Sequence, residues 1–107
     1  MTTSSFDTRE QAFENKFKAE EEQNFRIHAR AVKLFGLWAA GQMGLQSEHA
    51  DAYALALIDV DLQEAGHQDF MRKVKADLAE KKVETTDHHL ENQFKKMLEE
   101  ARRQLAK

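Results

Sequence analysis

Histidine and carboxylate side chains are the groups of this chain that could bind a metal ion, and their spacing decides whether they can act together. The five histidines are His28, His49, His67, His88 and His89. They fall in four different segments, and the adjacent His88 and His89 would point about 100° apart on a helix. The one Glu-x-x-His pattern, Glu64 to His67, is interrupted by Gly66 at a predicted helix end. Without a cysteine or a paired Glu-x-x-His motif, the sequence predicts solvent-exposed histidines, no metal site and no cofactor.

Acidic residues gather around one predicted helix end and raise the question of acid–base catalysis. These residues are Asp59, Asp61, Glu64 and Asp69. No nucleophile, glycine-rich loop or phosphate-cradling motif accompanies them, so they are interpreted as charges on an exposed face. The sequence predicts a protein that is not an enzyme.

Composition favours a single all-α domain. The 107 residues contain no proline and four glycines, which is typical of a helical protein. The absence of cysteine fits a reducing compartment, although a secreted protein without disulfides would look the same. The 16 basic and 19 acidic residues are interleaved and give a net charge of −3, which argues against a nucleic-acid partner. No signal peptide is visible, and the apolar run at 31–40 is too short for membrane insertion.

Three of the four predicted helices have clear apolar stripes and end signals. A helix over 48–65 follows Ser47 as N-cap and stops at Gly66, and a second covers 69–81. The last helix begins after Thr85 or Thr86, either of which could cap it. The short connections predict that neighbouring helices pack together in a four-helix, bundle-like domain over 20–107.

The first predicted helix is too long for the domain. It could run unbroken from Asp7 to Ala40, roughly 50 Å, whereas a domain of this size has a radius of gyration of about 13 Å. One end must therefore overhang. The segment 31–40 is apolar nearly all round and is expected at the centre of the core, with Trp38 buried. We expect the core to begin at Phe25.

Three aromatic residues near the N-terminus form a separate stripe. Phe6, Phe13 and Phe17 lie within about 40° of one another on a helix, and this stripe does not continue into the second half. Ordering the backbone of about fifteen residues costs on the order of 15–30 kcal/mol of conformational entropy. Burial of three phenylalanine side chains would contribute only roughly 5–9 kcal/mol of stabilisation. We expect residues 1–19 to form a frayed, partly disordered helical arm that orders on a partner. The alternative is that this segment folds back and completes the domain's own core.

Blocks of residues along nearly the whole chain resemble one known family. The blocks are Phe6-Asp7-x-Arg9-x-x-Ala12-Phe13-Glu14-x-Lys16-Phe17, Gly36-Leu37-Trp38-Ala39-Ala40, Glu64-Ala65-Gly66, Arg72-Lys73-Val74-x-Ala76-Asp77-Leu78 and Thr86-Asp87-His88. In this order they resemble the zeta subunit of the alphaproteobacterial F-type ATP synthase. Thr8, where family members often have a second acidic residue, departs from the pattern and leaves the contacts of the arm's end in doubt. Gly41 departs too and suggests an earlier helix end.

The resemblance implies an inhibitor of ATP hydrolysis. In that family the N-terminal arm enters a catalytic interface between the α and β subunits near the central rotor, γ, and blocks rotation in the hydrolytic direction. The implied partner-binding residues are Phe6, Asp7, Arg9, Ala12, Phe13, Glu14, Lys16 and Phe17. The protein would then lie in the cytoplasm, peripheral to the inner membrane through ATP synthase.

Two other roles remain open from the sequence. Some family members have been discussed as nucleotide binders; nothing here resembles a P-loop, so weak nucleotide binding would use a shallow surface site to which no residues are assigned. The rival to the inhibitor is a helical scaffold or adaptor that docks another partner through the same amphipathic arm.

Overall fold

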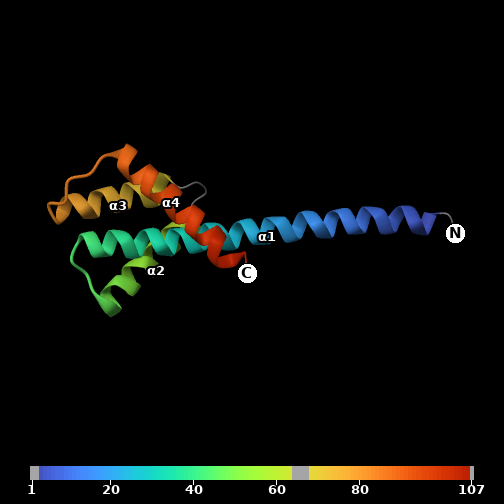
Figure 1. The fold of residues 1–107 in the computed structure, drawn as a ribbon, viewed down its shortest axis with the longest axis horizontal. Coiled ribbons are helices and arrows are strands. Elements are labelled where there is room, and N and C mark those ends of the chain that lie inside the picture. Colours follow the sequence, from blue (N-terminus) through green and yellow to red (C-terminus); the bar gives the residue numbers. More distant parts are fainter. Residues whose placement is uncertain (1–2, 64–67, 107) are drawn as a thin grey trace.

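Four helices form the protein (Figure 1). The computed structural model describes residues 3–63 and 68–106, and it describes side chains from residue 19 onward. The helices are α1 (Thr3–Gln42), α2 (Ser47–Gln63), α3 (Gln68–Glu80) and α4 (Asp87–Leu105). The described residues contain no strand, which confirms the all-α prediction.

Helix α1 is the central element, because it contacts each of the other three helices. Its buried hydrophobic residues are Ala31, Val32, Phe35, Ala39 and Ala40, each with no exposed surface, and Gly36 among them is buried as well. The prediction that 31–40 lies at the centre of the core is confirmed. The prediction that the core begins at Phe25 is wrong, since that ring is 59% exposed.

An aromatic cluster ties α1 to α3 and α4. The rings of Phe35, Phe70 and Phe94 meet at centroid distances of 5.1–6.1 Å, mostly edge to face. Trp38 was expected to be buried, but it lies at the margin, only partly buried, and stacks on Phe35 at 5.7 Å. The smaller ring of Phe35 takes the fully buried position because it lies between both partner helices.

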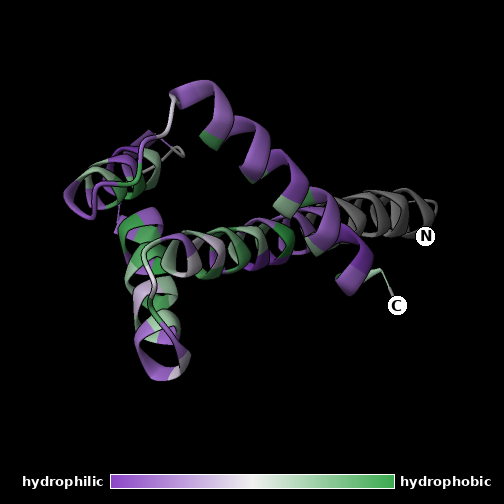
Figure 2. Ribbon diagram, turned by 60° about the vertical axis from the view of Figure 1, so that its left-hand side comes forward, coloured by the Kyte–Doolittle hydropathy of each residue, from purple (hydrophilic) through white to green (hydrophobic). Residues whose placement is uncertain are grey.

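Helices α1 and α2 cross at very short range. At Gly36 a Cβ atom would lie 2.8 Å from the Cα of Ala54, so only a glycine permits this approach. Leu57, fully buried one turn along α2, packs beside the same crossing. Figure 2 shows that α2 and the adjoining part of α1 are mostly apolar, in agreement with burial of this contact.

Helix ends use local hydrogen bonds that the sequence partly predicted. Thr86 caps α4, because its side-chain oxygen accepts from the His89 N–H at 3.1 Å; this decides between the two threonines. Gly44, with φ +78°, ends α1 in a Schellman motif. Gly41 therefore lies within α1 and does not end it. The start of α2 at Ser47 matches the expected position, whereas Gly66 lies outside the described residues.

The N-terminal half of α1 extends beyond the other helices (Figure 1). The molecule measures 69 × 25 × 21 Å and its radius of gyration is 18.3 Å, well above the value of about 13 Å for a compact domain of this length. The predicted overhang is confirmed. The first helix is one continuous element and does not fold back onto the core.

A glycine pair tests the α1–α2 crossing. We expect Gly36→Ala to lower the free energy of unfolding by about 1–3 kcal/mol, because the added methyl must displace the backbone of Ala54. Gly41→Ala is the matched control: nothing lies within 4 Å of its Cβ position, so we expect a gain of about 0.5–1 kcal/mol from helix propensity. Urea denaturation of both variants measures the difference, and equal effects would contradict the close crossing.

Candidate partner-binding surface

The residues predicted to bind a partner all lie in the projecting part of α1. The structure places their backbone in one helix, in the segment that extends past α2, α3 and α4 (Figure 1). Their side chains lie outside the described residues. These residues are Phe6, Asp7, Arg9, Ala12, Phe13, Glu14, Lys16 and Phe17.

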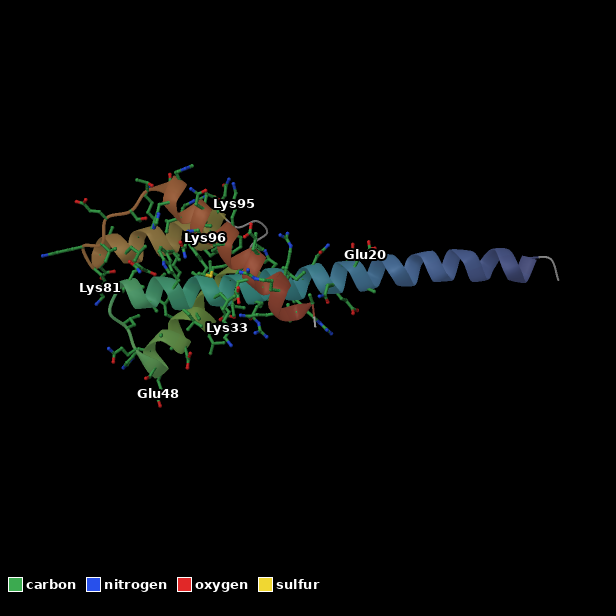
Figure 3. The ribbon with its side chains drawn as sticks, in the orientation of Figure 1. Glu20, Lys33, Glu48, Lys81, Lys95 and Lys96 are labelled. Atoms are coloured by element: carbon green, nitrogen blue, oxygen red, sulfur yellow. The ribbon has the colours of Figure 1, made fainter. Side chains whose placement is uncertain are left out.

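The projecting segment of α1 begins where the C-terminal end of α4 contacts α1, and this region is called the root of the segment. Gln23 Nε2 donates a hydrogen bond to the carbonyl of Leu105 at 3.4 Å, and Arg30 Nη1 donates to Gln104 Oε1 at 3.0 Å. Glu20, near the start of the described side chains, is exposed (Figure 3). The contact of the bundle with α1 therefore ends near Gln23, and the helix continues without a neighbour.

His28 joins α1 to α2 at this root. Its Nε2 lies 3.0 Å from Asp61 Oδ1, and its ring meets Phe70 and Phe94 edge to face at 6.2 and 5.9 Å. The side chain is 37% exposed, so the prediction of a solvated surface histidine is wrong for His28. Sequence spacing could not have found this contact, because Asp61 lies on another helix 33 residues away.

The other described histidines are exposed, as the sequence predicted, whereas the predicted exposed acidic face holds for Asp59 but is wrong for Asp61, whose side chain is only 11% exposed. His49, His88 and His89 are exposed, while His67 and Glu64 lie outside the described residues. Among the described residues, no group of three or more His, Cys, Asp or Glu side chains is placed to hold a metal ion. The same part of the chain contains no helix long and apolar enough to cross a membrane.

A shallow groove with a basic margin runs along α1 next to the root. Its apolar lining comes from three helices: Phe25 and Ala29 of α1, Ile58 of α2 and Leu105 of α4. Its cations are Arg26, Arg30 and Lys33, all exposed, which follow one another at helical spacing along α1. Sequence reasoning missed this groove because it assigned Phe25 to the core; the i, i+4, i+7 spacing of the three cations was the available signal.

A partly buried polar cluster links α2 to α3. The Tyr53 hydroxyl donates to Asp77 Oδ2 at 2.7 Å, and Lys73 Nζ donates to the same oxygen at 3.0 Å. Burial, reinforced by the hydrogen bond to Asp77 and its negative charge, raises the pKa of Tyr53 well above its usual value. The cluster is a structural contact, because the Tyr53 hydroxyl and Lys73 Nζ both pair with Asp77 within the bundle.

Comparison with known proteins identifies the family of this chain. A family model described as ATPase inhibitor subunit zeta matches residues 1–104, so the chain belongs to this family. This is a family of regulatory subunits and not of catalysts, and its partner is an ATP synthase. The resemblance identified from the sequence blocks is thereby confirmed.

A solved structure supports the same fold. A protein whose structure was determined by solution NMR is 36% identical, with a TM-score of 0.67. The match covers 77% of this chain and 93% of that one. A search of curated proteins found no match.

Titration of Tyr53 tests the α2–α3 contact. The folded protein holds the phenol proton to higher pH than the unfolded chain, so its stabilising effect is fully present below about pH 10 and is lost as the pH rises further. We expect Tyr53→Phe to cost about 1 kcal/mol at pH 7 and to weaken the alkaline fall in stability. Tyrosinate absorbance measures the ionisation directly, because this is the one tyrosine of the chain. Ionisation near pH 10 in the folded protein would contradict the contact.

Proposed function

We propose that this protein inhibits ATP hydrolysis by the F-type ATP synthase by inserting residues 1–19 of its first helix into an α/β catalytic interface near the central rotor. The inserted arm blocks rotation in the hydrolytic direction and needs no chemistry of its own. The bundle, residues 20–107, stays outside and carries the arm. The protein is thereby held in the cytoplasm, at the inner membrane, through its partner.

The overhang of α1 is the observation that carries this proposal. About 20 residues of helix, roughly 30 Å, precede Gln23, where the contact with α4 ends. Every described core residue of α1 lies at or after Ala31, so the bundle buries its core without using this segment. A helix with no neighbour of its own is suited to the groove of another protein.

The residue types of the arm fit such a groove. Phe6, Phe13 and Phe17 share one side of the helix by register, and Arg9 and Lys16 lie between them in sequence. Aromatic and arginine side chains supply a large share of binding energy at protein interfaces. Three buried phenylalanines would return roughly 5–9 kcal/mol, which offsets part of the cost of ordering the arm.

Removing the arm separates inhibition from folding. We expect deletion of residues 1–16 to abolish inhibition of ATP hydrolysis by the cognate enzyme, because the aromatic stripe is lost. The melting temperature of the bundle should change little, since the described core begins at Ala31. An ATPase assay with a thermal melt decides both points, and undiminished inhibition by the truncated protein would rule out the arm.

Single aromatic substitutions locate the anchor. Phe13→Ala or Phe17→Ala should weaken inhibition about tenfold or more with little loss of stability. Phe35→Ala is the matched control, because removal of this fully buried ring should lower the free energy of unfolding by about 3–5 kcal/mol. Inhibition titrations and urea denaturation compare the three variants. A large loss of stability in Phe13→Ala would place that ring in the core and contradict the proposal.

Recovery of the protein from membranes separates the inhibitor from an adaptor. Co-purification with the α, β and γ subunits of ATP synthase supports inhibition. If the protein is instead recovered with a different partner that it binds through its arm, and without these subunits, the result supports the adaptor.

A further inference from the structure

The groove beside the root of the arm has the properties of a second docking site. Its lining is apolar, and Phe25 leaves 59% of its surface in solvent, unusual for so large an apolar side chain. Leu62 of α2 is 58% exposed and directly follows Asp61, which contacts His28 of α1. Apolar surface therefore collects at the end of the α1–α2 crossing nearest the arm.

The margin of this groove carries positive charge only. Arg26, Arg30 and Lys33 line it, and no acidic side chain does. Among the described side chains, no carboxylate forms an ion pair with any of the three. Two of them, Arg26 and Lys33, also make no described hydrogen bond, whereas Arg30 is held by Gln104. The charge that best complements this margin is negative.

Polar contacts join the three helices of the groove in the protein alone. The Arg30–Gln104 and Gln23–Leu105 hydrogen bonds fix the end of α4 against α1. The His28–Asp61 contact fixes α2 against the same stretch. Because three helices are already in place, a partner need not order them on binding, which lowers the cost of association.

The groove and the aromatic stripe of the arm face different directions. At about 100° per residue, position 25 lies about 80° around α1 from position 17, and positions 26 and 33 lie about 160–180° from it. Along the axis, Phe25 is only about 12 Å from Phe17. One flat surface cannot contact both faces, although both lie on one continuous helix.

We propose that this groove binds a segment of the ATP synthase head that carries acidic side chains and one apolar anchor. This segment lies on the side of α1 opposite the surface that contacts Phe6, Phe13 and Phe17. This inference rests on the proposed function and adds a second contact to it. The apolar anchor fills the space between Phe25, Ile58 and Leu105, and carboxylates pair with Arg26 and Lys33. The arm supplies the block, and the groove holds the bundle at the mouth of the interface.

Charge reversal in the full-length protein tests the groove. The variant Arg26→Glu/Lys33→Glu should raise the concentration for half-maximal inhibition about tenfold or more, because cations become repelling carboxylates. Lys95→Glu/Lys96→Glu is the matched control: it makes the same change of charge on exposed lysines of α4, on the other side of α1 from Lys33 in Figure 3. We expect the control to inhibit within about twofold of the wild type. Circular dichroism melts verify that both variants fold.

The salt dependence of inhibition and an apolar substitution test the charged and the apolar parts of the groove separately. Inhibition by the wild type should weaken with added salt, and the groove variant should lose much of that dependence. Phe25→Ala should weaken inhibition about tenfold without changing the melting temperature, because its ring is mostly exposed. A groove variant that inhibits like its control overturns the inference while leaving the arm intact. A wild type that fails to inhibit overturns the proposed function itself.

Self-association provides one further decisive outcome. The outer face of α2 carries Asp51, Leu55 and Asp59, all exposed, and this acidic and apolar surface is also complementary to the groove. Analytical ultracentrifugation of the wild type and the groove variant detects a second copy in that position. A wild-type dimer that becomes a monomer in Arg26→Glu/Lys33→Glu would overturn the proposal, and a monomer in both supports it.

Discussion

The burial of one short stretch of α1 is the constraint on which the rest of the structure depends. Phe35 lies between the rings of Phe70 and Phe94, and Gly36 beside it lets α2 approach to near contact of the two backbones. Two adjacent residues therefore fix α1 against all three other helices. The fully buried side chains of α1 lie within 31–40, and the polar contacts of α1 with the bundle extend back only to Gln23, so the bundle does not use the part of the helix before that residue.

This division explains why a small domain can carry so long a helix. Burial of the second half of α1 holds its backbone in helical register, and the first half can extend that register without nucleating a new helix. The polar contacts near the root, from His28 to Asp61 and from Gln23 to Leu105, mark where tertiary support stops. The helix before them has no neighbouring helix, so its backbone is supported by propagation of the helical register.

Much of this arrangement could be predicted from the sequence, because it depends on local pattern. The stripes of α3 and α4, the overhang of α1 and a threonine cap at α4 all follow from spacing and end signals. The positions of Phe25, Trp38 and His28 could not be predicted, since each depends on where another helix crosses. Helical periodicity says which side of α1 a residue occupies but not whether α2 or α4 reaches that far along the axis. The groove beside Phe25 was missed for this reason, as it forms only where the ends of α2 and α4 meet α1.

The covalent continuity of α1 has a mechanical consequence. Kinks in helices form mainly at proline, at glycine or at inserted side chains, and α1 contains no proline. Its two glycines, Gly36 and Gly41, lie within or beyond the buried stretch, and Gly36 is held by the α2 crossing. The projecting segment thus has no built-in hinge between residues 3 and 35. Once the arm is helical, a sideways force on it must bend a regular helix or disturb the core around Phe35. In the proposed inhibitor, such a continuous helix would resist bending between the bundle and the partner, whereas a proline or an unpacked glycine in it would provide a point of bending.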